Sequence, residues 1–173
     1  MLAAHRVDIL VNNAGTQDRY PAVDFPLAAW DRVLDINVRA VFQLCQLFGR
    51  PMLERGQGKI INLASLLSFQ GGLTVPAYAA SKGAVAQLTK ALCNEWSSQG
   101  VNVNAIAPGY MATEMNAALL ADPDRLAALS ARIPAGRWGQ PDDIGNVVVF
   151  LASTAAAYIH GQILAVDGGW MAR

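Results

Sequence analysis

Short apolar runs alternate along the chain with longer stretches in which apolar residues recur at helical spacing. Such runs are typical of strands buried on both faces, as in open parallel sheets. They lie at residues 8–11, 59–65, 101–107 and 162–166. Residues 27–53 and 77–98 instead have an apolar residue every three or four positions, which predicts two long helices.

Proline and glycine mark the boundaries between these elements. Residues 16–26 contain Pro21 and Pro26 and are expected to form a loop, and Pro51 is expected to interrupt the first long helix near its end. Residues 114–131 are rich in alanine and leucine, which predicts mobile helices that would cover a binding site. Pro141 is expected to begin another helix.

Tyr78 and Lys82 lie four residues apart near the start of the helix predicted over residues 77–98. This spacing places both side chains on one face, where the ammonium would lower the pKa of the phenol from about 10 toward neutrality. A phenol of this kind suits proton transfer to or from a carbonyl or alcohol. The alternative is a half-buried tyrosine beside a solvated lysine.

Ser65 ends the strand predicted over residues 59–65, so its hydroxyl is expected at the carboxyl edge of the sheet. Ligands bind at this edge in open parallel sheets, and a hydroxyl there can hold a substrate oxygen beside Tyr78.

Composition narrows the possible functions. The chain has 173 residues, 53% of them hydrophobic, and its net charge is zero, so nucleic acid and anionic membranes are not expected partners. Cys45 and Cys93 lie in helical apolar patterns without metal-ligand spacing, which predicts buried free thiols, a cytoplasmic protein and no metal site. No apolar run reaches membrane-spanning length.

Several further motifs follow one another in a fixed order. They are Asn12 to Gly15 after the first strand, Asn37, Ser65, Tyr78 with Lys82, Pro108 with Gly109, and Val166 to Gly169. This ordered set resembles the short-chain dehydrogenase/reductase family over essentially the whole chain. The resemblance implies an α/β fold, here the C-terminal portion of a Rossmann-like doubly wound parallel sheet with flanking helices.

The resemblance also implies that residues 1–173 form a partial domain. Members of the family begin with a strand, a Gly-rich turn and a helix that receive the cofactor pyrophosphate, and the first strand here resembles the family's fourth. Residues 8–11 are therefore expected to form an exposed apolar edge that makes the isolated chain poorly stable or prone to associate.

Four residues correspond to the family's catalytic set. The resemblance makes Tyr78 the general acid/base, and Lys82 the residue that lowers its pKa and holds the cofactor ribose. Ser65 would orient the substrate oxygen, and the backbone carbonyl of Asn37 would hold a water of the proton relay.

The same comparison implies a nicotinamide cofactor, with NAD preferred and NADP not excluded. The residues expected to bind it are Asn13, Ala14, Gly15, Tyr78, Lys82, Pro108, Gly109 and Thr113. Thr113 would bond the carboxamide, although a helix-capping threonine is the alternative because a helix follows it.

Four residues are candidates for substrate contacts: Ser68, Gln70, Met111 and Arg137. Ser68 and Gln70 lie in the loop between Ser65 and Tyr78 and would bond hydroxyl groups, unless this segment only shapes the loop. Arg132 and Arg137 offer a guanidinium fork for a carboxylate. The motif Arg137-Trp138-Gly139 is widespread in the family that the chain resembles, however, which favours a structural role for Arg137. The tail, residues 167–173, would reach the site of a neighbouring subunit.

The expected function is hydride transfer between the cofactor and an alcohol or ketone of a sugar acid. Within the family, the chain resembles 2-deoxy-D-gluconate 3-dehydrogenases most and gluconate 5-dehydrogenases next. Another short-chain reductase is a further alternative, although the β-ketoacyl reductases match less well. A homo-oligomer, either a dimer or a tetramer, is implied. The alternative from another class is a non-catalytic remnant or partner subunit.

Overall fold

A four-stranded parallel sheet lies at the centre of the computed structural model, which describes residues 6–172. Its strands are β1 (Ile9–Asn12), β2 (Gly58–Leu63), β3 (Val101–Pro108) and β4 (Ile163–Val166), in that spatial order. The register places Leu10 opposite Ile60 and Ile60 opposite Val103. The predicted α/β fold with a parallel sheet and flanking helices is confirmed.

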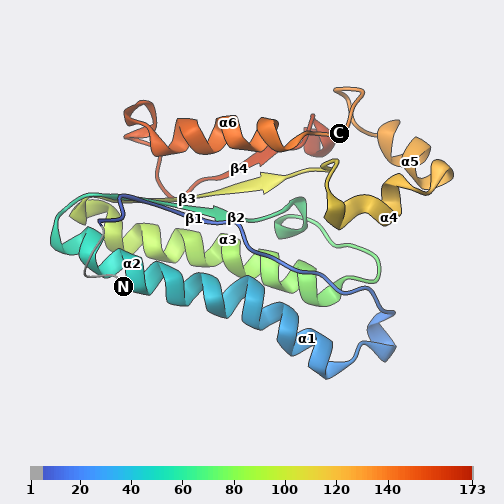
Figure 1. Cartoon of the computed structure of the whole chain (residues 1–173), viewed down its shortest axis with the longest axis horizontal. Helices are drawn as coiled ribbons and strands as arrows, with labels where there is room; N and C mark the ends of the chain where they lie inside the picture. Colours follow the sequence, from blue (N-terminus) through green and yellow to red (C-terminus); the bar gives the residue numbers. More distant parts are fainter. Residues whose placement is uncertain (1–5, 173) are drawn as a thin grey trace.

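Helices cover the two faces of the sheet unequally (Figure 1). One face packs against α2 (Ala40–Glu54) and α3 (Pro76–Trp96), and α6 (Pro141–Ala152) covers β2 and β3 on the other. The helix α1 (Leu27–Leu34) continues into α2 through a π-helical segment, Asp35–Arg39. Two short helices, α4 (Ala117–Leu120) and α5 (Pro123–Ser130), lie beyond one end of the sheet.

The expected interruption at Pro51 is wrong. The helix α2 runs on to Glu54 with Pro51 inside it. Proline removes one backbone hydrogen bond, and here that loss falls within the last two turns, where the packing of Met52 and Cys45 into the core outweighs it.

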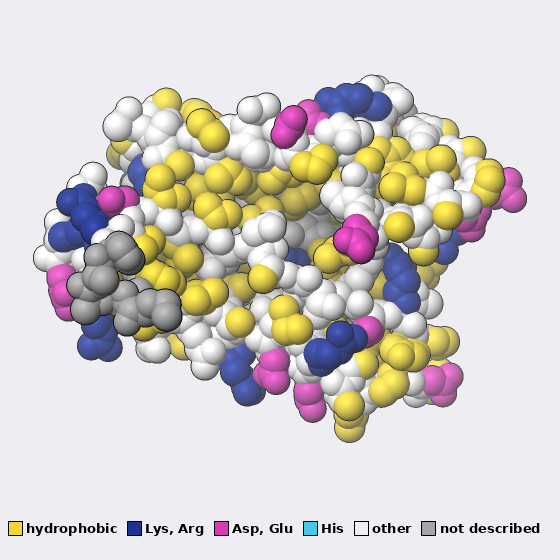
Figure 2. Space-filling model, in the orientation of Figure 1, with side chains coloured by type: hydrophobic (Ala, Val, Ile, Leu, Met, Phe, Trp, Pro, Cys, Tyr) yellow, Lys and Arg dark blue, Asp and Glu magenta, His cyan; other side chains and the backbone are white. Residues whose placement is uncertain are grey.

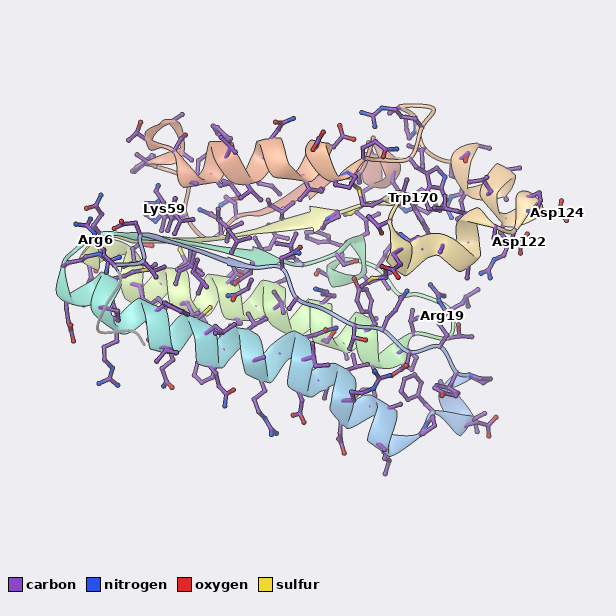
Figure 3. All side chains as sticks on the ribbon, viewed as in Figure 1. Arg6, Arg19, Lys59, Asp122, Asp124 and Trp170 are labelled. Carbon is purple, nitrogen blue, oxygen red and sulfur yellow. The ribbon has the colours of Figure 1, made fainter. Side chains whose placement is uncertain are left out.

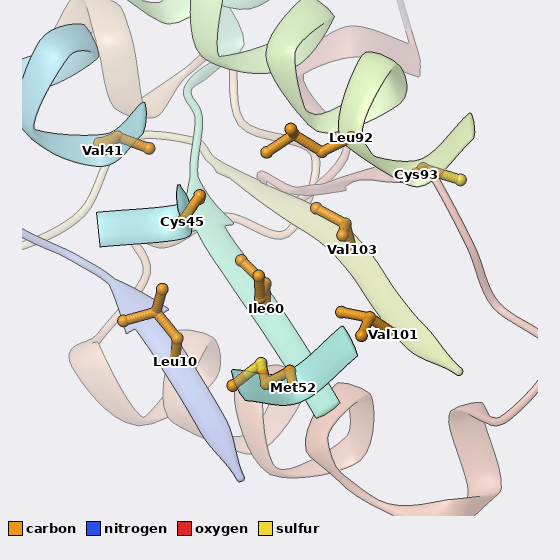
Figure 4. Packing of buried hydrophobic residues seen from close by; sticks show 9 residues of the cluster. All are labelled: Leu10, Val41, Cys45, Met52, Ile60, Leu92, Cys93, Val101 and Val103. Atoms are coloured by element: carbon orange, nitrogen blue, oxygen red, sulfur yellow. The ribbon is translucent and has the colours of Figure 1, made fainter. Parts of the chain in front are cut away.

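Two apolar cores hold the central strands from opposite faces. The core under α2 and α3, drawn in Figure 4, contains Leu10, Val41, Cys45, Met52, Ile60, Leu92, Cys93, Val101 and Val103. A second core under α6 is built from Ile61, Leu63, Ile106, Leu151 and Ala156. Burial of each branched side chain contributes roughly 1.5–3 kcal/mol, so β2 and β3 form the rigid centre on which the site is mounted.

A chain of buried polar side chains crosses this apolar interior. Asn12 Nδ2 donates to Asn62 Oδ1 at 2.8 Å, and Asn62 Nδ2 donates to the Thr89 hydroxyl at 3.0 Å. The two hydrogen bonds join β1, β2 and α3, and because each donor must meet its acceptor they fix the register of these elements. Asn12 was only part of a turn motif in the sequence, and periodicity could not have placed it here.

Both cysteines are buried free thiols, as predicted. Burial raises the pKa of Cys45 to about 12, which outweighs the hydrogen bond from Asn12 that lowers it. The Cys45 thiol is therefore neutral and serves as a packing group.

The strand β1 lies at one edge of the sheet, and its outer face is apolar. Ile9 is 45% exposed and Val11 is 38% exposed. Figure 2 shows hydrophobic side chains gathered in the hollow beside α6. The predicted exposed apolar edge is present, whereas the association expected from it stays a prediction.

The C-terminal tail packs against its own chain at Trp170. Trp170 opens the short 3-10 helix Trp170–Ala172, is only 4% exposed, and packs against Tyr110 of its own chain. The expectation that residues 167–172 reach the site of another subunit stays a prediction. Arg173 lies outside the described residues.

Across residues 6–172, no helix combines the length and the apolar character that crossing a membrane requires.

Gly100 is expected to be indispensable for stability. Its φ is +81°, and a Cβ there would lie 2.0 Å from the carbonyl oxygen of Gly56. Gly100→Ala should cost more than about 3 kcal/mol, because a left-handed conformation costs ~1–2 kcal/mol and the clash displaces the turn before β2.

Gly136 is the matched control, since its φ is +70° and no atom lies within 4 Å of an added Cβ. Gly136→Ala should cost only about 1 kcal/mol in urea unfolding. Equal losses in the two variants would show that the clash at Gly100 has no effect.

Candidate active site

A cavity of about 1240 Å³ opens at the carboxyl edge of the sheet. Loops that follow β1, β2 and β3 line it, together with the first turns of α3 and residues of α4, α5 and α6. This volume exceeds that of a typical drug-sized ligand site, so the cavity has room for a substrate and part of a cofactor.

Ser65 stands where β2 ends and the 3-10 turn Leu66–Ser68 begins. Its hydroxyl accepts a hydrogen bond from Leu67 N at 3.2 Å, which caps the turn and orients the side chain. Ser65 is half-buried and lines the cavity, as predicted from its place at the end of the strand.

Tyr78 and Lys82 lie one turn apart on α3, which begins with Pro76. The Lys82 ammonium is 5.6 Å from the centroid of the Tyr78 ring and donates to the carbonyl of Leu63 at 2.6 Å. Lys82 is 4% exposed and Tyr78 is half-buried. Both side chains line the cavity with Ser65, so the structure brings the three residues together.

The pKa of Tyr78 is raised from its ordinary value, because burial disfavours the phenolate. A hydrogen bond with Ser65 lowers it but does not outweigh burial. Desolvation also lowers the pKa of Lys82 to about 8. The expected fall of the phenol's pKa toward neutrality is therefore wrong for this arrangement, because burial raises the pKa of Tyr78. At neutral pH Tyr78 is a protonated phenol that can donate its proton.

Asn37 lies in the π-helical segment Asp35–Arg39 and is completely buried. Its side chain accepts a hydrogen bond from Thr16 N at 2.8 Å and donates to Thr16 O at 2.9 Å and to the Ser81 hydroxyl at 2.9 Å. These bonds tie the loop after β1 to α3 beside Lys82. A π-helical turn is frequent at functional sites, but the water-holding role of the Asn37 carbonyl stays a prediction.

All the residues predicted to bind the cofactor line this cavity: Asn13, Ala14, Gly15, Tyr78, Lys82, Pro108, Gly109 and Thr113. A Cβ on Gly15 would reach ordinary contact distance of Asn37 Oδ1, at 3.5 Å, and of Lys82 Nζ, at 3.7 Å. A Cβ on Gly109 would lie 2.6 Å from the Asp167 Cα, so this glycine serves packing as well as the cavity.

Thr113 begins the 3-10 turn Glu114–Asn116 but makes no side-chain capping hydrogen bond to it in the described chain. The capping alternative is therefore not supported, and the hydroxyl is available in the cavity. Together with the spare donors of the Lys82 ammonium, this polar lining fits a nicotinamide cofactor's carboxamide and ribose.

Two of the four predicted substrate residues, Gln70 and Met111, line the cavity. Ser68 does not, because its hydroxyl donates to the carbonyl of Lys82 at 2.7 Å and accepts from Ser65 N at 3.3 Å. The assignment of Ser68 to substrate is wrong: its hydrogen bonds join the loop after β2 to α3.

The assignment of Arg137 to substrate is also wrong. Its guanidinium holds Asp143 through two bonds of 2.7 and 2.9 Å, and it does not line the cavity. Arg137 lowers the pKa of Asp143 well below its usual range, and Asp143 in turn accepts from Gln140 N at the start of α6. The geometry therefore favours the alternative, in which Arg137 is a structural residue.

The sequence did not single out Arg19, Arg125 or Trp170 as cavity residues. Figure 3 shows Arg19 and Trp170 at the end of the molecule where α4 lies, although Arg19 precedes α1 and Trp170 lies close to the C-terminus. No spacing rule links such distant segments; only the aromatic residue after the Gly168-Gly169 pair was a signal.

Comparisons with known proteins agree with this geometry. Residues 2–171 match the family described as enoyl-(acyl carrier protein) reductase. A 2-dehydro-3-deoxy-D-gluconate 5-dehydrogenase from Bacillus subtilis is 59% identical over 168 residues, which are 97% of this chain and 66% of the relative. The chain thus spans about two thirds of the length of the curated relatives it matches.

Two solved structures superpose closely. A protein from Agrobacterium tumefaciens, proposed to be a 2-deoxy-D-gluconate 3-dehydrogenase and bound to NADP, is 56% identical with a TM-score of 0.94 over 96% of this chain and 68% of that one. A gluconate 5-dehydrogenase from Burkholderia cenocepacia, in complex with NADP and tartrate, is 44% identical with a TM-score of 0.97 over 99% of this chain and 68% of that one. The sequence match and the shared fold show that the chain belongs to the short-chain dehydrogenase/reductase family.

Proposed function

We propose that this chain is an NAD(P)-dependent oxidoreductase of sugar acids, which interconverts a ring or chain ketone and the corresponding alcohol. The observation that carries the proposal is the meeting of Ser65, Tyr78 and Lys82 in one cavity at the carboxyl edge of the sheet. The family membership supports the reaction type, and the relatives support the substrate class.

In the direction of ketone reduction, Tyr78 donates its proton to the substrate oxygen. The raised pKa keeps the phenol protonated at neutral pH, so the acid is available in its working form. Ser65 holds the same oxygen beside the phenol. When Tyr78 has given up its proton, the nearby Lys82 ammonium stabilises the phenolate that remains.

A bound nicotinamide cofactor would supply or accept the hydride. Residues 13–15, Pro108, Gly109 and Thr113 would hold it against Tyr78, and Lys82 would bond a ribose hydroxyl. NAD is the form implied by the sequence resemblance, whereas two of the similar structures were bound to NADP. Both forms are therefore tested.

The names of the relatives point to an acid substrate with several hydroxyls. A 2-dehydro-3-deoxy-D-gluconate 5-dehydrogenase and a gluconate 5-dehydrogenase are both similar to this chain, and the second was crystallised with tartrate, itself a hydroxy acid. Gln70 and Met111 are the sequence-predicted residues that face such a substrate in the cavity. Assembly into a dimer or tetramer is part of the proposal.

Titration of NADH and NADPH with the purified 173-residue chain tests the proposal. The expected result is saturable binding, followed by oxidation of the reduced cofactor with 5-keto-D-gluconate and by reduction of NAD⁺ or NADP⁺ with 2-dehydro-3-deoxy-D-gluconate. A folded chain that binds neither cofactor would favour the alternative of a non-catalytic partner subunit.

Tyr78→Phe should lower kcat/KM for ketone reduction by about 10²–10⁴-fold, because it removes the proton donor and nothing else. The affinity for NADH, measured by fluorescence, should stay within about threefold. Tyr158→Phe removes a hydroxyl from a side chain that is 99% exposed and serves as the control. Full turnover by Tyr78→Phe would refute the assigned role.

The pH dependence of kcat/KM should reflect the deprotonation of Lys82. Since the pKa of Tyr78 is raised and that of Lys82 is lowered to about 8, the first group to deprotonate as pH rises is Lys82. The kcat/KM for reduction should be level near neutrality and then fall above pH 8 by up to about tenfold per unit.

Lys82→Arg keeps a positive charge with a pKa above about 12, so any activity that remains should show this fall at a higher pH. The role assigned to Lys82 charge is contradicted if the two profiles fall at the same pH.

A further inference from the structure

The cavity concentrates positive charge in a chain that has none in excess. The whole sequence has 13 basic and 13 acidic residues, yet Arg19, Lys82, Arg125 and Arg132 line the cavity against a single acid, Glu114. The ion pairs found within residues 6–172 involve none of these four cations. Their charge is therefore directed at whatever enters the cavity.

Arg132 differs from the other two arginines because its guanidinium is already held in place. It lies over the ring of Trp170 with its carbon 3.9 Å from the ring centroid. Stacking on an aromatic face orients the plane of a guanidinium without neutralising it, and leaves the N–H groups at its edge free.

The platform under Arg132 is rigid. Trp170 is 4% exposed, packs at 4.7 Å against the ring of Tyr110, and donates its indole N–H to Gln70 Oε1 at 3.4 Å. It shares an apolar cluster with Leu66, which directly follows Ser65. The stacked guanidinium is thus connected through packed side chains to the segment that holds the substrate oxygen.

A planar cation with free N–H groups in a fixed orientation matches a carboxylate, which it can bind through two parallel hydrogen bonds. Because the guanidinium is ordered before the ligand arrives, little side-chain entropy is lost on binding. Arg137 shows the structural contrast, because its two parallel hydrogen bonds already go to the chain's own Asp143.

We infer that Arg132, held over the ring of Trp170, binds the carboxylate of the substrate and makes the site selective for acids over neutral polyols. This inference rests on the proposed function, because it identifies a specificity residue of the same site. Gln70, which accepts from Trp170, keeps the platform in position.

Calorimetric titration of the 173-residue chain with D-gluconate and with D-glucitol tests this inference. Glucitol replaces the carboxylate by a neutral CH₂OH group and keeps the hydroxyls. Each titration is run alone and with saturating NADPH, a reduced cofactor that cannot react with either alcohol. Wild type, Arg132→Gln and Arg132→Lys are compared, and Arg50→Gln on the exposed surface of α2 is the matched loss of one charge.

Wild type should bind gluconate more tightly than glucitol. Arg132→Gln should lower the affinity for gluconate about 10- to 100-fold, as expected for the loss of charge-assisted hydrogen bonds. The affinity for glucitol should stay unchanged. The gluconate affinity of Arg132→Lys should lie between those of wild type and Arg132→Gln, because lysine keeps the charge but not the planar fork. Arg50→Gln should bind gluconate and glucitol as wild type does. The affinity for NADPH should be unchanged in all variants.

Equal binding of gluconate and glucitol by wild type, undetectable binding of gluconate, or unchanged gluconate affinity in Arg132→Gln would each overturn the inference. So would a loss of NADPH affinity in Arg132→Gln, since the anion held would then be a cofactor phosphate. If Arg132→Gln fails to fold, as judged by its melting curve, Arg132→Lys and the wild-type comparison decide.

The outcomes for the site and for the reaction are separable. Gluconate binding that depends on Arg132 without any hydride transfer would leave this inference standing and remove the proposed function. Turnover of sugar acids that is unchanged in Arg132→Gln would support the proposed function and overturn this inference.

Discussion

The hydrogen bond between the Lys82 ammonium and the carbonyl of Leu63 is the constraint on which the site depends. A buried ammonium is costly unless it is well hydrogen-bonded, and the shift of its pKa to about 8 reflects this cost. The bond connects α3 to the end of β2 and so fixes Tyr78 relative to Ser65. Gly15 lies beside the ammonium and leaves space that a larger side chain would fill.

Around this contact, polar side chains fix the register of the elements, which apolar packing alone does not determine. Apolar cores hold β2 and β3 between α2, α3 and α6, but apolar contacts tolerate small slips along a strand. The pair Asn12 and Asn62 allows one register only, and Asn37 ties the loop after β1 to α3. The positions of the reacting groups are therefore set by directional bonds within an apolar frame.

The sequence predicted the site best where local spacing determines geometry. Tyr78 and Lys82 share a helix face because they are four residues apart, and Ser65 is at the sheet edge because it ends a strand. It failed where partners decide the outcome. Ser68 and Arg137 have the right chemistry for a substrate, but Lys82 O and Asp143 occupy them. The direction of the Tyr78 pKa shift depends on burial, which spacing alone does not reveal.

The contrast between Arg132 and Arg137 shows how a fold separates binding groups from structural ones. Both are arginines in one short segment, and composition gives no reason to prefer either. Arg137 is neutralised by Asp143, which also accepts a hydrogen bond from Gln140 N. This pair therefore stabilises the start of α6. Arg132 meets Trp170, which is brought to it by the last turn of the chain. An aromatic partner holds a cation in place while leaving its charge intact, and a carboxylate partner holds it by consuming that charge. For an anionic substrate, the arginine that matters is the one whose neighbour is a ring.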